Sequence, residues 1–322
     1  MRIVYLCGFT LASEVAASQR VLSVAKLLTE LGHTVTFIDV NPKKAGTEDW
    51  HGFPVTSFIS QNGFLGGLRY KVALAPIRRI LSQTQGVRLV IAYNYAGLSL
   101  LRLQRYCKRR GIRVASDAAD WPQPLGSPLH RALMKLDIDV RMRYANRRMD
   151  GLIAITRYLA RTYPTVPSVI LPPVVDLRDE KWQACRVTQG YADPTVRLVT
   201  VNTAGPGKEN LPRLFAMLCQ AREAGARPFT LEVIGMTREQ YAGAYHTQVP
   251  EALEADVTFA GRLSHRETIA RIARSAYFVF IRDSNRFTEA GFPTKYCESI
   301  ACGTPVLNTR TTDLGPYLPP AD

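Results

Sequence analysis

The chain has 322 residues, of which 46% are hydrophobic and 21% charged, and 41 Lys and Arg against 27 Asp and Glu give a net charge of +14. This composition is typical of a globular protein, excludes disorder, and the length suggests two domains. No window approaches the roughly 18 consecutive apolar residues of a membrane span. The N-terminus enters a strand-like run directly, so we expect no secretory signal. We therefore expect a cytoplasmic protein whose six scattered cysteines stay reduced.

The charge is uneven along the chain. Residues 1–175 carry 24 basic and 10 acidic side chains, whereas residues 176–322 carry 17 of each. A uniformly basic nucleic-acid binder would not show this asymmetry, and the basic residues lack interleaved aromatic residues. We expect no nucleic-acid partner.

The first 40 residues predict a strand, a helix and a second strand. Residues 2–7 form an apolar run, residues 18–31 repeat apolar side chains at helical spacing before Gly32, and residues 34–40 are again apolar. Parallel strands covered on both faces show such continuous apolar runs. The segment is therefore predicted to be a βαβ unit.

Further strand patterns form two series on either side of Pro172-Pro173. They cover residues 87–93, 112–116, 151–155 and 168–171, and then 196–201, 229–235, 257–260, 276–281 and 304–308. Helical patterns lie between most of them, which predicts an α/β chain. We expect two Rossmann-like domains, 1–175 and 176–322, with parallel sheets facing a central cleft. Ligands of such sheets bind beyond the carboxyl ends of the strands.

The turn after the first strand lacks the glycines of a dinucleotide site. Gly8 is present, but the second and third glycines of the GxGxxG pattern are missing. Asp39, at the end of the second strand, is therefore predicted to be a solvated strand end rather than a ribose ligand. Gly8 is either a point of close approach to a ligand or an ordinary turn glycine.

No metal or cofactor site is expected. Asp137 and Asp139 lie two residues apart in a predicted helix over 129–149, so their side chains point to nearly opposite sides. The histidines show no ligand spacing either.

Two carboxylates and an indole follow the predicted strand 112–116. We expect Asp117 and Asp120 to project into the cleft, where they would hold sugar hydroxyls while Trp121 stacks on a sugar face. A helix cap and loop anchors are an equally good interpretation of the same residues.

The last quarter of the chain predicts a phosphate site. Gly291 and Pro293 shape a loop that enters a helix, and the free N–H groups at a helix start favour an anion. Lys295 and Arg282 would add positive charge. Glu298 lies one turn into the helix, beside an expected core face of Cys297, Ile300 and Ala301. It would accept two hydrogen bonds from a ribose, or alternatively be a solvated helix residue.

In their order and spacing these features resemble the retaining GT-B-fold glycosyltransferases of the group 1 (family 4) type, which serve bacterial polysaccharide biosynthesis. The resemblance covers nearly the whole chain, and the run from Ala290 to Val306 is its most specific part. The other matching segments are Ala16–Arg20, Leu31–Val35, Asp120-Trp121, Ile155–Leu159, Leu171–Asp176, Gly207–Leu211 and Phe259–Arg262.

The resemblance implies a UDP- or GDP-linked sugar held by the C-terminal domain and a saccharide or lipid-linked acceptor held by the N-terminal domain. Transfer would proceed with retention and without a metal. The implied donor-binding residues are Lys208, Glu298, Thr294, Lys295, Gly291, Phe292, Arg262, Arg282 and Gly8. The implied acceptor side consists of Asp117, Trp121 and Arg20.

The sequence departs from the family pattern at two positions. The second glutamate, eight positions before Glu298, is replaced by Ala290, so we expect the adjacent Glu289 to be catalytic together with Asp120. The arginine before the phosphate lysine is replaced by Thr203, for which Arg262 or Arg282 would substitute.

Relatives continue with further helices, so we expect the second domain to be incomplete at its C-terminus. The alternative functions are a nucleotide-sugar epimerase of the same fold and an impaired sugar-nucleotide or membrane-surface binding protein.

The positive excess lies in the half that would hold the acceptor. Much of it falls in 102–113 and in the predicted helix 129–149, whose expected apolar stripe consists of Leu129, Leu133, Leu136, Val140 and Tyr144. Such a helix suits an anionic inner leaflet, and it also suits a solvated face over an ordinary core. We expect a cytoplasmic protein that is peripheral on the inner membrane face.

Overall fold

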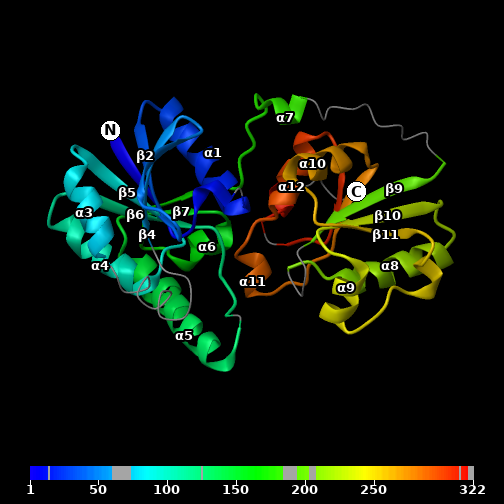
Figure 1. Cartoon of the computed structure of the whole chain (residues 1–322). Coiled ribbons are helices and arrows are strands. Elements are labelled where there is room, and N and C mark those ends of the chain that lie inside the picture. Colours follow the sequence, from blue (N-terminus) through cyan, green and yellow to red (C-terminus); the bar gives the residue numbers. More distant parts are fainter. Residues whose placement is uncertain are drawn as a thin grey trace. The chain divides into compact units, whose positions relative to one another are not determined.

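The computed structural model describes residues 1–13, 15–59, 74–124, 126–183, 194–202, 208–311 and 313–317. The chain divides into two compact units (Figure 1). Unit 1 comprises Met1–Val174 with Glu289–Phe292, and unit 2 comprises Val175–Thr288 with Pro293–Asp322. Among the described residues, no helix is long and apolar enough to span a membrane.

Unit 1 is built on a sheet with the strand order β3-β4-β2-β1-β5-β6-β7-β8. Its strands are β1 (Arg2–Cys7), β2 (Thr34–Asn41), β3 (Gly46–Trp50), β4 (Phe53–Ile59), β5 (Val87–Tyr93), β6 (Arg113–Ala118), β7 (Gly151–Ala154) and β8 (Ser168–Ile170). All neighbours pair in parallel except β3 and β4, which are antiparallel. The carboxyl ends of the parallel strands therefore share one edge of the sheet.

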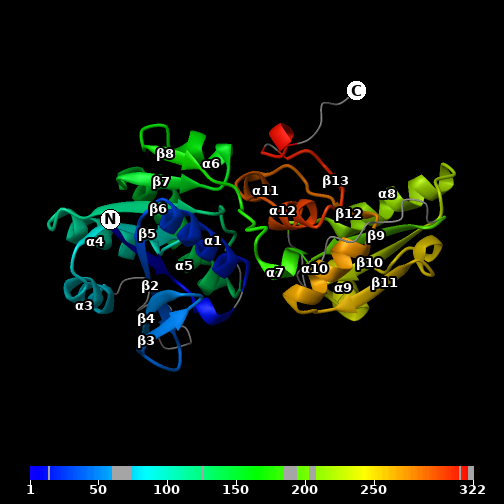
Figure 2. The same cartoon turned by 90° about the horizontal axis from the view of Figure 1, so that it is seen from above.

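The β3–β4 hairpin was not expected from the sequence. It extends the sheet at the edge beyond β2 (Figure 2). His51 and Gly52 form its turn with positive φ angles of 53° and 82°, as tight hairpins require. Four of the five residues of β3 are exposed, so the strand lacks the apolar pattern by which buried strands are identified.

Helices cover both faces of the unit 1 sheet. They are α1 (Ala16–Glu30), α3 (Ala75–Gln83), α4 (Gly97–Lys108), α5 (Pro128–Asp139) and α6 (Arg157–Thr162). Val21, Val24 and Ala25 of α1 pack on one face, and Ile77 of α3 and Leu103 of α4 pack on the other. Short 3₁₀ turns occur at Leu11–Ser13 and Asn146–Arg148.

The single helix expected over 129–149 is not observed. α5 ends at Asp139 and continues as a π-helical segment over Val140–Ala145. Of the expected apolar stripe, Leu129 and Leu136 are 64% and 62% exposed, so the expectation that it covers an ordinary core is wrong for these residues. The buried hydrophobic side chains of α5 and the π-helical segment are instead those of Ile138, Met142 and Ala145.

Unit 2 contains a parallel sheet with the order β11-β10-β9-β12-β13. Its strands are β9 (Val196–Val201), β10 (Phe229–Ile234), β11 (Val257–Gly261), β12 (Tyr277–Phe280) and β13 (Val306–Asn308). The helices are α7 (Glu180–Gln183), α8 (Leu211–Glu223), α9 (Arg238–Tyr245), α10 (His265–Arg274), α11 (Arg286–Glu289) and α12 (Thr294–Ala301), with 3₁₀ turns at Glu251–Leu253 and Gly315–Tyr317. Figure 1 shows α8 and α9 on one face of the sheet and α10 and α12 on the other.

Candidate functional site

Glu298 is the centre of a charged cluster in unit 2. Its Oε1 lies 3.2 Å from Nε2 of His265, and its Oε2 accepts from Nζ of Lys295 at 2.5 Å. His265 begins α10 a short loop after the carboxyl end of β11, so the cluster lies at the edge of the sheet where ligands of such folds bind. Only 5% of Glu298 is exposed, so its interpretation as a solvated helix residue is wrong.

The position of His265 follows from the start of α10. Ser264 and Glu267 form a capping box, in which each side chain binds the other's backbone N–H, and this fixes the first turn. Trp182 of α7 is 3% exposed and meets the His265 ring edge-on at a centroid distance of 6.3 Å. Sequence reasoning missed His265 and Trp182. The signal for His265 was its place right behind a capping residue and a strand end.

The charge state of Glu298 follows from its neighbours. Burial alone would raise the pKa of this carboxyl, but the hydrogen bond with His265 and the Lys295 ammonium outweigh burial and lower the pKa below its usual 4.5. Glu298 is therefore an ionised carboxylate at neutral pH. Each of its oxygens has a second lone pair, so the group can still accept hydrogen bonds from ligand hydroxyls.

The buried face of α12 differs from the expected one. Ile300, expected in the core face, is 52% exposed, whereas Tyr296, Glu298 and Ser299 are buried. The helix starts after Pro293 without a side-chain cap and has no acidic residue in its first turn. The half-buried Thr294 and Lys295 thus stand at a positive helix end, which favours an anion.

The other expected phosphate ligands lie in different settings. Arg282 follows β12, is 7% exposed, and donates from Nε to Oε1 of Glu209 at 3.1 Å, so its charge is paired within the protein. Lys208 is half-buried and lies 4.8 Å from the centre of the Phe287 ring. Arg262 is exposed just beyond β11. Gly207 and Thr203 lie outside the described residues.

The loop that carries Glu289 is assigned to unit 1. Glu289 ends α11 and is half-buried, and Gly291 and Phe292 are buried. All three were expected in the C-terminal domain, but their segment groups with residues 1–174.

Asp117 does not project from the sheet edge as expected. It lies inside β6, because that strand runs on to Ala118, and its exposure is 0%. Arg20 of α1 donates to Oδ1 at 2.7 Å, and the Tyr5 hydroxyl donates to Oδ2. Burial, reinforced by the Asp117 carboxylate, raises the pKa of Tyr5 well above its usual value. Asp117 and Arg20 thus form a buried ion pair that ties α1 to the sheet, and neither side chain lies exposed at the sheet edge where acceptor contacts were expected.

Asp120 lies at the carboxyl edge of the unit 1 sheet. It is half-buried and accepts a hydrogen bond from Nδ2 of Asn94 at 3.0 Å. Asn94 directly follows β5 with a positive φ of 40°, and its carbonyl accepts from Nη1 of Arg141 at 2.6 Å. Trp121 is half-buried beside Asp120, and Gly8 is exposed at the end of β1. Sequence reasoning missed Asn94 and Arg141; an asparagine directly after a strand was the available signal.

Asp39 is also buried rather than solvated. It lies within β2 with 2% exposure, accepts from the backbone N of Leu11 at 2.9 Å, and accepts from the Ser57 hydroxyl at 2.5 Å. The expectation of a solvated strand end is wrong. The carboxylate instead closes the turn after β1.

Among the residues that the structure describes, no group of three His, Cys, Asp or Glu side chains is placed to hold a metal ion. Cys7, Cys107 and Cys302 are buried free thiols, and Cys185 lies outside the described residues.

The fold has counterparts among solved structures, although no family model and no curated protein sequence matches the chain. Anabaena HepE in complex with UDP is 16% identical with a TM-score of 0.64, over 99% of this chain and 83% of that one. The chain has the GT-B fold. The catalytic domain of Arabidopsis thaliana starch synthase IV, bound to ADP and acarbose, is 11% identical with a TM-score of 0.63, over 100% and 85% of the two chains. The lipopolysaccharide outer core galactosyltransferase WaaB is 13% identical with a TM-score of 0.60, over 96% and 80%. The predicted GT-B fold is confirmed.

Proposed function

We propose that this chain is a glycosyltransferase that moves a sugar from a nucleoside-diphosphate sugar to a saccharide or lipid-linked acceptor with retention. The observation that carries the proposal is the buried carboxylate of Glu298, set between His265 and Lys295 at the ligand-binding edge of a GT-B sheet. A fixed carboxylate suits the two hydroxyls of a ribose. HepE and starch synthase IV, which share the fold, were solved with UDP and ADP respectively.

The departing diphosphate needs positive charge, because the transition state gathers negative charge on it. Lys208, Arg262 and the uncapped start of α12 are the groups of unit 2 that would supply it. In this proposal, these groups stabilise the negative charge on the diphosphate without a metal ion. Removal of one such donor costs about 10²–10³ in turnover in other enzymes.

Asp120 and Glu289 are the carboxylates proposed to act at the reacting sugar. The support for Asp120 is its place beyond β6 and the Asn94 hydrogen bond that fixes its side chain. Fixed geometry matters because a catalytic group must be held close to its reactive position.

The test is incubation of the protein with a panel of labelled nucleotide sugars, with and without lipid-linked acceptors, while nucleoside-diphosphate release is measured. Glu298→Ala is expected to abolish nucleotide binding, since the ribose loses its acceptor. Glu223→Ala, which removes an exposed glutamate at the end of α8, is the control and should bind as the wild type. Unchanged affinity of Glu298→Ala would refute the ribose assignment.

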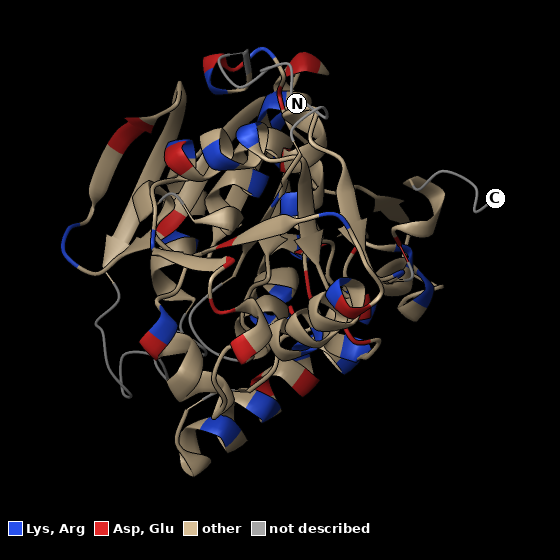
Figure 3. Ribbon diagram, turned by 90° about the vertical axis from the view of Figure 1, so that its right-hand side faces the viewer, with Lys and Arg blue, Asp and Glu red and all other residues tan. Residues whose placement is uncertain are grey.

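We further propose that unit 1 docks on an anionic inner leaflet to reach a lipid-linked acceptor. α5 exposes Leu129 and Leu136 beside the exposed Arg131 and Lys135. Figure 3 shows α5 as the lowest helix, with blue bands of basic residues along it. An apolar stripe flanked by cations is the pattern of an interfacial helix, and each basic residue adds about 1 kcal/mol near an anionic surface.

Vesicle sedimentation tests this docking. Leu136→Ser is expected to weaken binding to phosphatidylcholine vesicles that contain phosphatidylglycerol, because it removes exposed apolar surface from α5. Leu31→Ser removes a 71% exposed leucine at the end of α1 and should leave binding unchanged. Equal binding of the wild type to neutral and anionic vesicles would count against the docking.

A further inference from the structure

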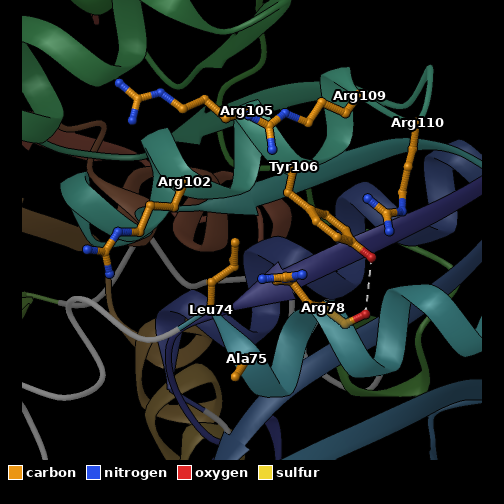
Figure 4. A pocket seen from close by; sticks show the side chains of 8 residues that line it. All are labelled: Leu74, Ala75, Arg78, Arg102, Arg105, Tyr106, Arg109 and Arg110. Atoms are coloured by element: carbon orange, nitrogen blue, oxygen red, sulfur yellow. Dashed lines mark hydrogen bonds between the residues drawn. The ribbon is translucent and has the colours of Figure 1, made fainter.

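A second basic feature of unit 1 is a pocket between α3 and α4. Its volume is about 460 Å³, and Figure 4 shows its lining: Leu74, Ala75, Arg78, Arg102, Arg105, Tyr106, Arg109 and Arg110. Five of these eight residues are arginines. α4 starts past the carboxyl end of β5 and runs back toward the start of β6, so the last turn of α4 and the arginines after it lie toward the opposite edge of the sheet from Asp120. The pocket therefore belongs to neither candidate site described above.

Tyr106 holds two of the guanidinium groups in place. The Arg110 and Arg78 guanidinium carbons lie 4.0 Å and 5.2 Å from the centre of its ring, and the Tyr106 hydroxyl donates to the Arg78 carbonyl at 3.3 Å (Figure 4). Stacking on an aromatic face restricts a guanidinium but leaves its N–H fork available to an anion. The two cations lie within a Debye length, about 10 Å at ordinary ionic strength, so they repel each other unless an anion lies between them.

The local sequence offers these arginines no counter-charge. Between Asp49 and Asp117 the chain contains eleven Lys and Arg and no Asp or Glu. The fold of α3 and α4 thus gathers Arg78 and Arg110 around a cavity, in a stretch of sequence that contains no acidic residue.

We propose that the pocket binds a phosphate-bearing ligand, with Arg78 and Arg110 as its principal contacts. Arginine forks bind phosphate oxygens in pairs, and a diphosphate presents enough oxygens for both. Tyr106, Leu74 and Ala75 form the apolar part of the lining, against which the group that carries the phosphate packs. The ligand is a soluble diphosphate or the headgroup of an anionic lipid, two sources with the same recognition chemistry.

The test compares two double variants that remove equal charge, each with one change in α3 and one at or just after the end of α4. Arg78→Gln with Arg110→Gln removes the stacked pair. Arg79→Gln with Lys108→Gln removes two exposed cations of α3 and α4 that do not line the pocket. Inorganic pyrophosphate is titrated calorimetrically into each protein, and sedimentation is measured with phosphatidylcholine vesicles with and without phosphatidic acid. Thermal unfolding of each variant shows that it is folded.

We expect the pocket variant to lose roughly tenfold to a hundredfold in affinity for pyrophosphate per arginine, and the charge-matched control to bind almost as the wild type. Arg110→Lys should fall between them, since it keeps the charge without the fork. Pocket-dependent binding to phosphatidic acid vesicles alone would assign the lipid source and still support the site. Equal losses in the pocket variant and in the control, for both probes, would overturn the proposal.

Because Leu136→Ser lies on α5, it separates this site from the proposed docking helix. Pyrophosphate affinity should be unchanged in that variant. Loss of pyrophosphate binding there would contradict a site confined to α3 and α4.

Discussion

At the residue scale, the buried pair of Arg20 and Asp117 is a point where a single change should destabilise unit 1. Their side chains are 6% and 0% exposed, so neither charge can be solvated when its partner is removed. We expect Asp117→Asn to lower the free energy of unfolding by about 3–5 kcal/mol, because a buried guanidinium then lacks its counter-ion. Urea denaturation measures this loss.

The double variant Arg20→Met with Asp117→Leu provides the control. It should be less destabilised than Asp117→Asn, because no uncompensated charge stays buried. If the double variant is as unstable as the sum of the single changes, the two side chains act independently and the ion-pair interpretation is incorrect.

Glu298 predicts a pH dependence of stability in unit 2. Its folded-state pKa is lowered, so its ionised form contributes stability above its usual pKa of 4.5, and this contribution disappears as the pH falls through the lower folded-state value. Glu298→Gln should therefore be destabilised by about 1.5–3 kcal/mol near neutral pH, the range for hydrogen bonds to charged groups. The difference from wild type should shrink in acid. Urea midpoints over a pH series measure it, and a constant difference would contradict the ionised contact.

At the element scale, α4 packs closely on the π-helical segment Val140–Ala145. A Cβ on Gly97, the first residue of α4, would lie 2.6 Å from the backbone N of Arg141. Gly97→Ala should destabilise the protein by about 1–3 kcal/mol, since backbone has to shift. It should also lower turnover, because Arg141 binds the carbonyl of Asn94, which holds Asp120.

A second glycine separates this steric effect from helix propensity. Gly243 lies within α9 and has nothing within 4 Å of an added Cβ. Gly243→Ala should raise stability by about 0.5–1 kcal/mol and leave turnover unchanged. Equal shifts of the melting temperature in the two variants would show that a Cβ at position 97 causes no steric destabilisation.

The strands and helices also show which parts of the fold could be predicted from sequence patterns. Residues 2–7 and 87–93 were predicted with the bounds that β1 and β5 have, because strands buried on both faces leave continuous apolar runs. β3 is an exposed edge strand, so its polar sequence carried no such signal. The 129–149 segment was predicted as one α-helix because the sequence pattern did not reveal that the α-helix gives way to π-helical and 3₁₀ turns after Asp139.

The candidate site was predictable only one residue at a time. Glu298 stood out because a loop and a helix start precede it in the sequence. Its partner His265 lies 33 positions away, and their meeting depends on how α10 packs on α12. Likewise, Arg20 and Asp117 are separated by 97 positions, and their pairing could not be read from the sequence. Asp117 was expected beyond the strand, but β6 ends two residues later than predicted, at Ala118.

At the scale of the whole molecule, the charge asymmetry and the two separate cores predict that different ligands protect different units. Each unit has its own core and its own sheet edge, so a ligand stabilises the elements that it touches.

A nucleoside diphosphate at about 100 times its Kd should add about 2.7 kcal/mol to the free energy of unfolding of the protein that binds it. Hydrogen exchange should then slow in α10 and α12 of unit 2. Anionic vesicles should instead slow exchange in α5, because the excess basic residues lie in unit 1 and α5 carries the exposed Leu129 and Leu136. Slowed exchange in α5 on addition of the nucleotide alone, with α10 and α12 unaffected, would place the nucleotide in the basic unit and contradict the assignment of the donor to Glu298.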